Sequence, residues 1–131
     1  MNPPTSSGTP RPRILLVDDS EAFRGQVRKL LSKRTDLQLV GEAADGEEAV
    51  RLTHELAPDI VIMDILMPRL NGIGATLKIT SEFPSITVIA LSMHGDDGFR
   101  RAMLDAGAST YLLKDNVMHE LPKALAGWGQ T

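Results

Sequence analysis

The stretch Asp59–Gly72 reads DIVIMDILMPRLNG, and it decides the fold class. Its first part, Asp59–Met63, is an apolar run rich in β-branched residues, which predicts a buried β-strand. Asp64 follows this run directly, and a loop containing a proline leads to Gly72, where we expect a helix to about Ser81. A strand that is apolar on both faces is typical of a parallel sheet covered by helices on both sides.

The same pattern repeats outward from this stretch in both directions. The other expected strands are Arg13–Val17, Leu37–Ala43, Ile86–Leu91 and Ser109–Leu113. Helices are expected between them, one capped by Asp19 or Ser20, one over Asp45–Leu56 and one over Asp97–Ala106. Because strands and helices alternate, the sequence predicts an α/β fold with a doubly wound, five-stranded parallel sheet. Right-handed crossovers favour the strand order 2-1-3-4-5, which is flavodoxin-like.

The last helix is expected to be short or kinked because of Pro122. If this helix began at Asn116, Pro122 would lie in its interior, where it lacks a donor and clashes with the carbonyl of Met118. A start near Glu120 would place Pro122 close to the first helical position, where proline is favourable. Gly127 would then end the helix.

The length of 131 residues suits one domain. Residues 1–12 (MNPPTSSGTPRP) are too rich in Pro, Ser, Thr and Gly to bury a core, so we expect a disordered tail there. The domain is expected over residues 13–126, with a short C-terminal tail at 127–131.

Composition excludes several classes of site. The chain has no cysteine, which excludes disulfides, thiolate zinc sites and cysteine nucleophiles and fits a cytoplasmic location. The net charge is −3 and no run of Lys or Arg stands out, so we expect no direct nucleic-acid binding by this segment. No apolar run approaches the roughly 20 residues that span a bilayer, so no membrane association is expected.

Polar side chains follow the expected strands at their carboxyl ends. Asp18 and Asp19 follow the first strand, Asp64 the third, Ser92 the fourth and Lys114 the fifth. In open α/β sheets, ligands bind beyond this edge, at the point where the strand order reverses. These side chains are therefore expected to meet at one site.

The residue types at this edge indicate phosphoryl chemistry with a divalent cation. Closely spaced carboxylates repel one another, and a hard cation such as Mg²⁺ relieves that repulsion. One carboxylate can then act as the nucleophile toward a phosphoryl donor and form an acyl phosphate. Lys114 and Ser92 would stabilise the charge on the transferred group.

Each residue also has a purely structural interpretation. Asp18, Asp19 and Ser20 could simply cap a helix, and Asp64 could cap the loop that follows it. Lys114 could be a solvated lysine, as most lysines are. Taken together these interpretations are weak, because they require all of these groups to fall at the same edge of one sheet by coincidence.

The sequence resembles the receiver domain of two-component response regulators. The matching segments are LLVDDSEAFR (Leu15–Arg24), DIVIMDILMPRLNG (Asp59–Gly72), VIALSMH (Val88–His94) and GASTYLLKD (Gly107–Asp115). Together they extend over nearly the whole chain from Arg13 to Ala126, and the run YLLKD is similar to the NarL/FixJ type.

The resemblance implies a role for each residue of the expected site. Asp64 would accept the phosphoryl group. Asp19 and Asp64 would ligate Mg²⁺ directly, Asp18 mainly through water, and Leu66 through its backbone carbonyl.

The resemblance also implies a switch. Ser92 would move toward the phosphoryl group, Tyr111 would change rotamer with it, and Lys114 would contact the phosphoryl oxygens. The donor would be a histidine kinase. The face formed by the fourth helix, the fifth strand and the last helix would dock partners or form homodimers.

A helix-turn-helix DNA-binding domain normally follows a receiver of the NarL/FixJ type, and this sequence contains none. The chain would thus be a receiver that acts alone, or one whose output, transcriptional regulation, depends on a domain outside this sequence. In either case we expect a signalling switch that catalyses only its own phosphorylation and dephosphorylation, not a turnover enzyme.

Two alternatives stay open at this point. Phosphatases and phosphotransferases with an aspartyl nucleophile usually carry a second carboxylate two residues further along the strand, and here that position is Leu66. A docking module that has lost phosphorylation would not need the complete set of Asp18, Asp19, Asp64, Ser92 and Lys114.

Overall fold

The structure is a computed structural model that describes residues 11–67, 69, 71–93 and 97–128. Its sheet contains five strands in the order β2-β1-β3-β4-β5, all parallel. The strands are β1 (Arg13–Val17), β2 (Gln38–Ala43), β3 (Ile60–Asp64), β4 (Thr87–Ser92) and β5 (Thr110–Leu113). The predicted strand order and fold class are confirmed.

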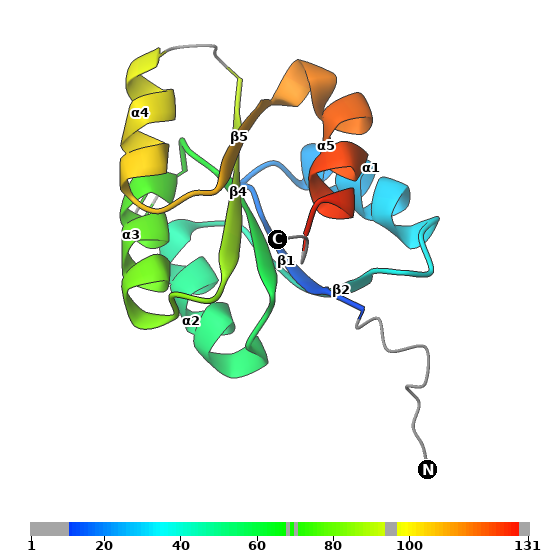
Figure 1. Ribbon diagram of the computed structural model, residues 1–131, viewed down its shortest axis with the longest axis horizontal. Helices are drawn as coiled ribbons and strands as arrows, with labels where there is room; N and C mark the ends of the chain where they lie inside the picture. The colour runs from blue at the N-terminus through cyan, green and yellow to red at the C-terminus, as the bar shows by residue number, and fades with distance from the viewer. Residues whose placement is uncertain (1–10, 68, 70, 94–96, 129–131) are drawn as a thin grey trace.

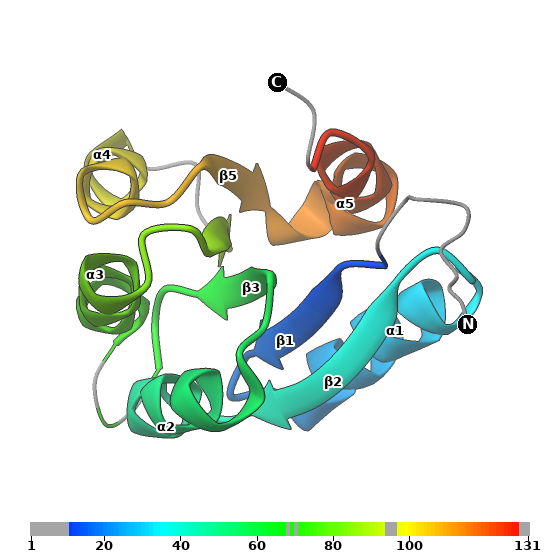
Figure 2. The same ribbon diagram turned by 60° about the horizontal axis from the view of Figure 1, so that its bottom comes forward.

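Helices cover both faces of this sheet. The helices are α1 (Glu21–Ser32), α2 (Gly46–Leu56), α3 (Gly72–Glu82), α4 (Asp97–Asp105) and α5 (Val117–Ala126), with a 3₁₀ turn at Lys114–Asn116. Figures 1 and 2 show α1 and α5 on one face of the sheet and α2, α3 and α4 on the other.

Polar caps begin three of these helices. Ser20, Asp45 and Asn71 each accept a hydrogen bond from the backbone N–H three residues later. Such caps satisfy donors that the first helical turn leaves unpaired. Each capped helix begins just beyond the carboxyl end of a strand or of the loop that follows it, so these caps also shape the loops at that edge.

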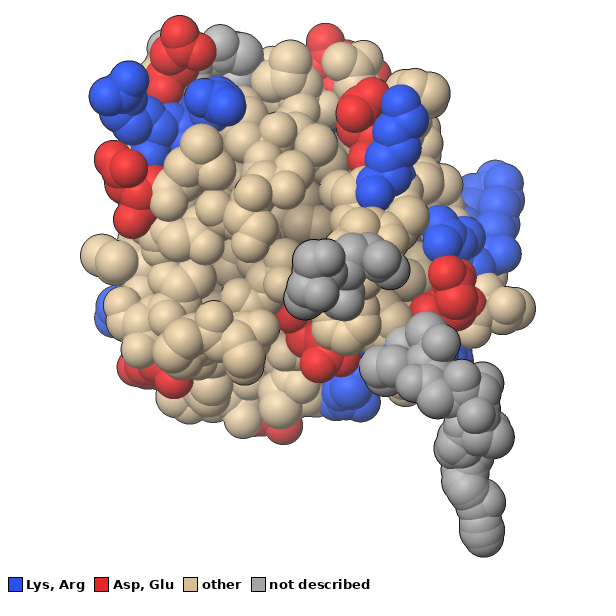
Figure 3. All heavy atoms as spheres, in the orientation of Figure 1, with Lys and Arg blue, Asp and Glu red and all other residues tan. Residues whose placement is uncertain are grey.

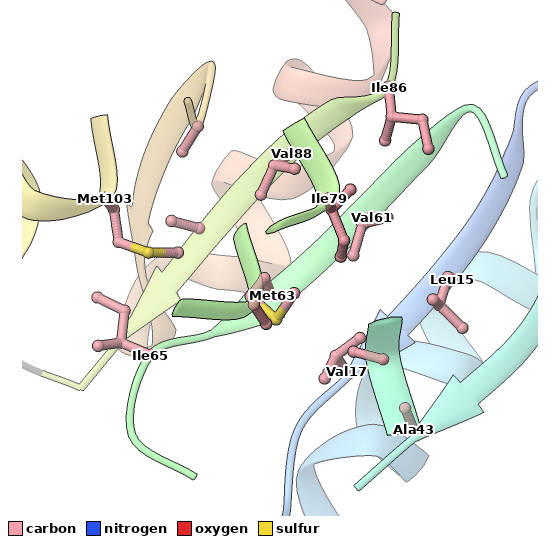
Figure 4. Packing of buried hydrophobic residues seen from close by; sticks show 14 residues of the cluster. Leu15, Val17, Ala43, Val61, Met63, Ile65, Ile79, Ile86, Val88 and Met103 are labelled. Carbon is pink, nitrogen blue, oxygen red and sulfur yellow. The ribbon is translucent and has the colours of Figure 1, made fainter. Parts of the chain in front are cut away.

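The sheet divides the core into two halves because neighbouring residues of a strand point to opposite faces. On β3, Val61 and Met63 pack with α2, α3 and α4, whereas Ile60 and Ile62 pack with α1 and α5. Figure 4 shows the first of these half-cores, in which Met63 lies among side chains from several elements. This packing buries both sides of the central strands β1, β3 and β4, as the sequence pattern predicts.

The prediction that the last helix begins near Glu120 is wrong. Helix α5 begins at Val117 and carries Pro122 in its interior. Val117, Leu121 and Leu125 are buried at intervals of four residues and pack into the half-core under α1 and α5. This apolar stripe stabilises the full helix despite the hydrogen bond that Pro122 cannot donate.

The folded domain extends slightly beyond its expected ends. Arg11 donates to the carbonyl of Leu37 at 3.0 Å, and Pro12 is buried and accepts from the N–H of Gln38. Both residues were expected in the disordered tail; residues 1–10, the rest of that tail, lie outside the described residues. At the other end Trp128 packs on the half-core under α5, while residues 129–131 lie outside the described part.

The surface carries charges of both signs. On the face in Figure 3, basic and acidic side chains lie next to one another in small groups, and wide uncharged areas separate these groups. Within the described residues, none of the helices combines the length and the apolar character that a membrane crossing needs.

Candidate functional site

The expected site residues meet at the carboxyl ends of the central strands. Asp64 is the last residue of β3 and Ser92 is the last residue of β4. Both strands therefore end one residue later than expected. Asp18, Asp19 and Asp64 each place a carboxylate oxygen within 4.8 Å of the other two. Asp18, Asp64 and Ser92 are buried, whereas Asp19 is exposed.

The buried Asp18 is held in place by contacts from several elements. Its N–H donates to the carbonyl of Ala43 on β2 at 3.0 Å, and its Oδ1 accepts from the N–H of Ser20 at 2.8 Å. Its backbone carbonyl accepts from Arg24 Nη1 at 2.6 Å. Its Oδ2 lies 2.5 Å from Lys114 Nζ, yet it has no hydrogen bond of good geometry among the described residues. This last contact is therefore an ion pair, and the Oδ2 atom can still accept another ligand.

Lys114 brings the positive charge of the site. Its ammonium pairs with Asp18 and also lies 3.4 Å from Asp64 Oδ1. The ring of Phe23, in the first turn of α1, lies on the ammonium with Nζ 4.5 Å from the ring centroid. The side chain of Lys114 is only 10% exposed, so these contacts act in a partly desolvated place where they are stronger than in water.

The pKa of Asp64 is raised to about 6, first by burial, then by the neighbouring charge of Asp18, with a smaller contribution from Asp19. Lys114 acts in the opposite direction and limits the rise. Burial and the neighbouring like charges therefore both disfavour the ionised form of the Asp64 carboxyl. Any cation added beside it would favour its ionised form.

Gly72 closes the loop that follows Asp64. Its N–H donates to the carbonyl of Ile65 at 2.7 Å, and a Cβ at this position would lie 1.9 Å from the carbonyl oxygen of Asp64. Only glycine permits this approach of the α3 N-terminus to β3. The approach keeps the intervening loop, which contains Leu66, beside the Asp64 carboxylate.

A contact that the sequence did not reveal ties this loop to α2. Arg69 adopts a left-handed backbone conformation with φ of 47°, and its carbonyl accepts from the N–H of Glu47 at 3.2 Å. Its Nε and Nη2 both donate to Asp45 Oδ2, at 3.1 and 2.9 Å. The N–H of Glu48 and the guanidinium of Arg69 lower the pKa of Asp45, against the opposing effect of its burial. We call this contact the Arg69–Asp45 latch.

A second contact of this kind holds the loop after β1. Besides the carbonyl of Asp18, Arg24 contacts Glu42 on β2 at 3.0 Å and Glu21 at 2.5 Å. Arg28 contacts Glu42 at 2.6 Å, and the hydrogen bonds from Arg28 and Arg24 lower the pKa of Glu42. The helical spacing of Arg24 and Arg28 places both on one side of α1, but only the fold shows that β2 carries their partner.

A hollow opens over the carboxylates. Its described lining consists of Asp19, Asp64, Ile65, Leu66, Ser92, Met93 and Lys114. The side chain of Leu66 is 53% exposed beside the site. Tyr111 lies on β5 next to Ala90, two residues before Ser92 on β4, and it packs against the half-core of α2, α3 and α4. The structure thus brings together every expected site residue except Tyr111, which lies further from the carboxyl end of the sheet, at the level of Ala90.

The three acidic side chains fit a hard divalent cation. The donors are all carboxylate oxygens, which is the ligand type that Mg²⁺ prefers. Among the described residues, Oδ2 of the fully buried Asp18 has no hydrogen-bond partner, and three carboxylates surround the one ammonium of Lys114, so the site can accept a further cation.

Known proteins with similar sequences agree with this arrangement. The family profile of the response regulator receiver domain matches residues 14–126. The transcriptional regulatory protein DegU of Brevibacillus brevis is 38% identical over 120 residues, which cover 89% of this chain and 51% of DegU. The response regulator protein VraR of Staphylococcus aureus is 37% identical over 113 residues, which cover 86% of this chain and 54% of VraR. The chain therefore spans about half the length of the curated relatives it matches.

Solved structures lead to the same family. A LuxR-family two-component response regulator from Aurantimonas sp. SI85-9A1 superposes with a TM-score of 0.84 and 38% identity, covering 89% of this chain and 84% of that one. The signal receiver domain of NarL from Mycobacterium tuberculosis also gives a TM-score of 0.84, with 31% identity, 89% coverage of this chain and 94% of its own. Binding of Mg²⁺, phosphorylation and pairing with histidine kinases are features of this family. The chain belongs to the family of response regulator receiver domains.

Proposed function

We propose that this receiver domain accepts a phosphoryl group on Asp64 and thereby switches a partner-binding surface. The observation that carries the proposal is the meeting of Asp18, Asp19, Asp64 and Lys114 at one end of the sheet. Three oxygen donors and one ammonium form a charge pattern that complements a divalent cation and a phosphoryl group together.

The transfer step needs no base in the protein. A carboxylate oxygen of Asp64 attacks the phosphorus of a phosphohistidine on the kinase and forms the new O–P bond. The P–N bond breaks as this bond forms, and its electron pair goes to the imidazole nitrogen, which takes up a proton. We expect Lys114 and Ser92 to contact the phosphoryl oxygens, because both line the hollow over Asp64.

Asp19, Asp64 and the backbone carbonyl of Leu66 would hold Mg²⁺ directly, and Asp18 would hold it mainly through water. When bound, the ion supplies positive charge that favours the ionised form of Asp64 and neutralises phosphoryl oxygens. The N–H of Ser20 and the guanidinium of Arg24 meanwhile fix the orientation of Asp18.

The switch would involve Ser92 and Tyr111. Movement of the Ser92 hydroxyl toward the phosphoryl group would change the room beside Tyr111, which lies next to Ala90 on the neighbouring strand. Such a shift needs contacts with the phosphoryl group that differ between the two states. Tyr111 packs with the α4 side of the core, so α4 and β5 are where we expect the surface to change.

A homodimer through α4, β5 and α5 is part of the same proposal. β5 is an edge strand whose four residues are only half-buried, and Met103 is the one buried residue that α4 contributes. Sedimentation with and without the phosphoryl donor would test it. Transcriptional regulation is proposed as the output from the relatives DegU and VraR, which extend well beyond the matched segment.

The first experiment is intact-mass analysis after incubation with acetyl phosphate and Mg²⁺. We expect one labile phosphoryl group on the wild-type chain, none without the metal and none on Asp64→Asn. The matched control is Asp105→Asn, which removes an exposed carboxylate at the end of α4 and should be phosphorylated like the wild type.

Two outcomes would contradict the proposal. No phosphoryl group on a folded wild-type chain would favour a docking module that does not use phosphorylation. Rapid release of phosphate from many equivalents of acetyl phosphate would favour an aspartyl phosphatase.

A further inference from the structure

We infer that Phe23 is a positioning residue for the phosphoryl-transfer site, because its ring holds the Lys114 ammonium in place without occupying its hydrogen-bond donors. The inference rests on the proposed function of Asp64 and adds a residue to it. The observation is the contact between Lys114 Nζ and the Phe23 ring, 4.5 Å from the centroid, beside the two carboxylates that pair with the same ammonium.

The backbone fixes the place of the ring. Phe23 lies in the first turn of α1, and its N–H donates to the Oγ of Ser20, the cap of that helix, at 3.2 Å. The N–H of Ser20 in turn donates to Asp18 Oδ1. The ring and the carboxylate of Asp18 are thus held by the same short segment, so the two partners of Lys114 keep a fixed relation to each other.

The chemistry of the ring differs from that of any polar partner. A lysine ammonium has three N–H donors, and each carboxylate or water in contact with it occupies one of them. An aromatic face attracts the charge through its quadrupole and accepts no directional bond. The ring can therefore stabilise the ammonium beside Asp18 and Asp64 while its N–H donors remain available to an incoming phosphoryl oxygen.

The ring also controls solvent at the ammonium. Phe23 and Lys114 line a surface hollow together with Ser20, Gln26, Met93 and Asp115. Even so, the Lys114 side chain is only 10% exposed. A smaller side chain at position 23 would enlarge this hollow and let water compete for the ammonium, which would weaken its interaction with the phosphoryl oxygens.

The test compares the rate of phosphorylation by acetyl phosphate at saturating Mg²⁺ in variants of position 23. Phe23→Leu keeps an apolar side chain without the aromatic face, and we expect it to slow the reaction by about fivefold. Phe23→Tyr restores the face and should restore the rate. Replacement of Phe23 with phenylalanines carrying one, two and three ring fluorines weakens the quadrupole at nearly constant shape, and the rate should fall stepwise along that series.

Controls separate this role from a structural one. Phe83→Leu makes the same change on a half-buried phenylalanine that packs against His54, away from the site, and should leave the rate unchanged. In the proton spectrum the ring should shift the ε-protons of Lys114 upfield, and Phe23→Leu should abolish that shift. The Mg²⁺ affinity should stay the same in every Phe23 variant.

A wild-type rate in Phe23→Leu, or equal rates along the fluorinated series, would overturn the inference and leave the proposed function intact. If the wild-type chain takes no phosphoryl group at all, the proposed function fails, and the role of Phe23 fails with it.

Discussion

Two buried threonines of the chain differ in the hydrogen bonding of their hydroxyl groups. Thr53 and Thr76 are both fully buried in helices. The Oγ1 of Thr53 donates to the carbonyl of Ala49 at 2.7 Å, whereas the Oγ1 of Thr76 has no hydrogen-bond partner within the part of the chain that the structure describes. A buried hydroxyl without a partner loses its hydration and gains nothing in return.

We expect Thr76→Val to raise the free energy of unfolding by about 1 kcal/mol, because valine has the same shape and no hydroxyl to desolvate. The matched variant Thr53→Val should lower the free energy of unfolding by about 1 kcal/mol, because it removes a hydrogen bond that is made. Urea unfolding of the three proteins measures both changes. Equal destabilisation by the two substitutions would show that Thr76 has a partner after all.

Asp64 should make the metal-free protein less stable as the pH rises. Its pKa of about 6 in the folded chain lies above the ordinary value of 3.8, so the folded state binds the proton more tightly than the unfolded state does. The stability contribution is therefore present below about pH 4 and is lost as the pH rises through about 6.

Asp64→Asn removes this dependence. With the metal chelated, we expect the variant to be more stable than the wild type at pH 7.5, on the order of 1–3 kcal/mol, and the difference to shrink at pH 5. The other titrating groups are common to both proteins and cancel in the comparison. A wild type that gains stability relative to Asp64→Asn between pH 5 and pH 7.5 would contradict the raised pKa.

The sequence predicts some residues of the site and not others. Asp18, Asp19, Asp64, Ser92 and Lys114 can be found because each stands where an apolar run ends. Chain position alone then places them at the carboxyl edge of a parallel sheet. The contact partners of these residues, Phe23 and Arg24, belong to a helix whose rotation about its axis depends on packing that no short pattern encodes.

At the scale of elements, the Arg69–Asp45 latch joins the loop after β3 to the start of α2. The cap at Asp45 is visible in the sequence, because aspartate precedes a helical pattern there. The left-handed backbone of Arg69 is not visible, since arginine rarely adopts it. At Pro122 the sequence is misleading, because the proline favours a later start of α5. The burial of three apolar residues of α5 outweighs this preference, and the helix begins at Val117.

Arg69→Gly tests the latch, because glycine tolerates the same backbone conformation but has no guanidinium. We expect the affinity for Mg²⁺ to fall several-fold, since the loop that contains Leu66 would lose its tie to α2. Calorimetric titration measures the affinity. Arg51→Ala is the control, because it removes an exposed arginine of α2 that pairs only with Glu48 and Glu55 among the described residues. Equal losses in the two variants would indicate a general effect of charge.

At the scale of the whole molecule, the alternation of strands and helices was sufficient to predict the sheet order. The three central strands β1, β3 and β4 are buried on both faces, so their apolar runs are continuous and easily recognised. The ends of the domain were less predictable, because Arg11, Pro12 and Trp128 are ordered by contacts with distant strands or helices.

Binding of Mg²⁺ should stabilise the whole domain, because the unfolded chain does not bring the three carboxylates together. At 100 times the dissociation constant we expect about 2.7 kcal/mol of added stability and a clear rise in the unfolding temperature. Asp19→Asn changes an exposed carboxylate that we propose as a ligand, without disturbing the core, and should abolish most of this gain, whereas Asp105→Asn should keep it. Scanning calorimetry with and without the ion makes the comparison; an equal rise in all three proteins would point to ion binding elsewhere.

The position of Trp128 decides which optical signals the protein offers. It is the only tryptophan of the chain, and it lines a hollow with Ile60 and Thr87. These are the first residues of β3 and β4, whose last residues, Asp64 and Ser92, belong to the site. The indole therefore lies at the opposite end of the sheet from Asp64. Its fluorescence should change when the α1 and α5 half-core unfolds and should not change when the metal or the phosphoryl group binds. A fluorescent reporter of the switch would therefore have to be introduced on α4.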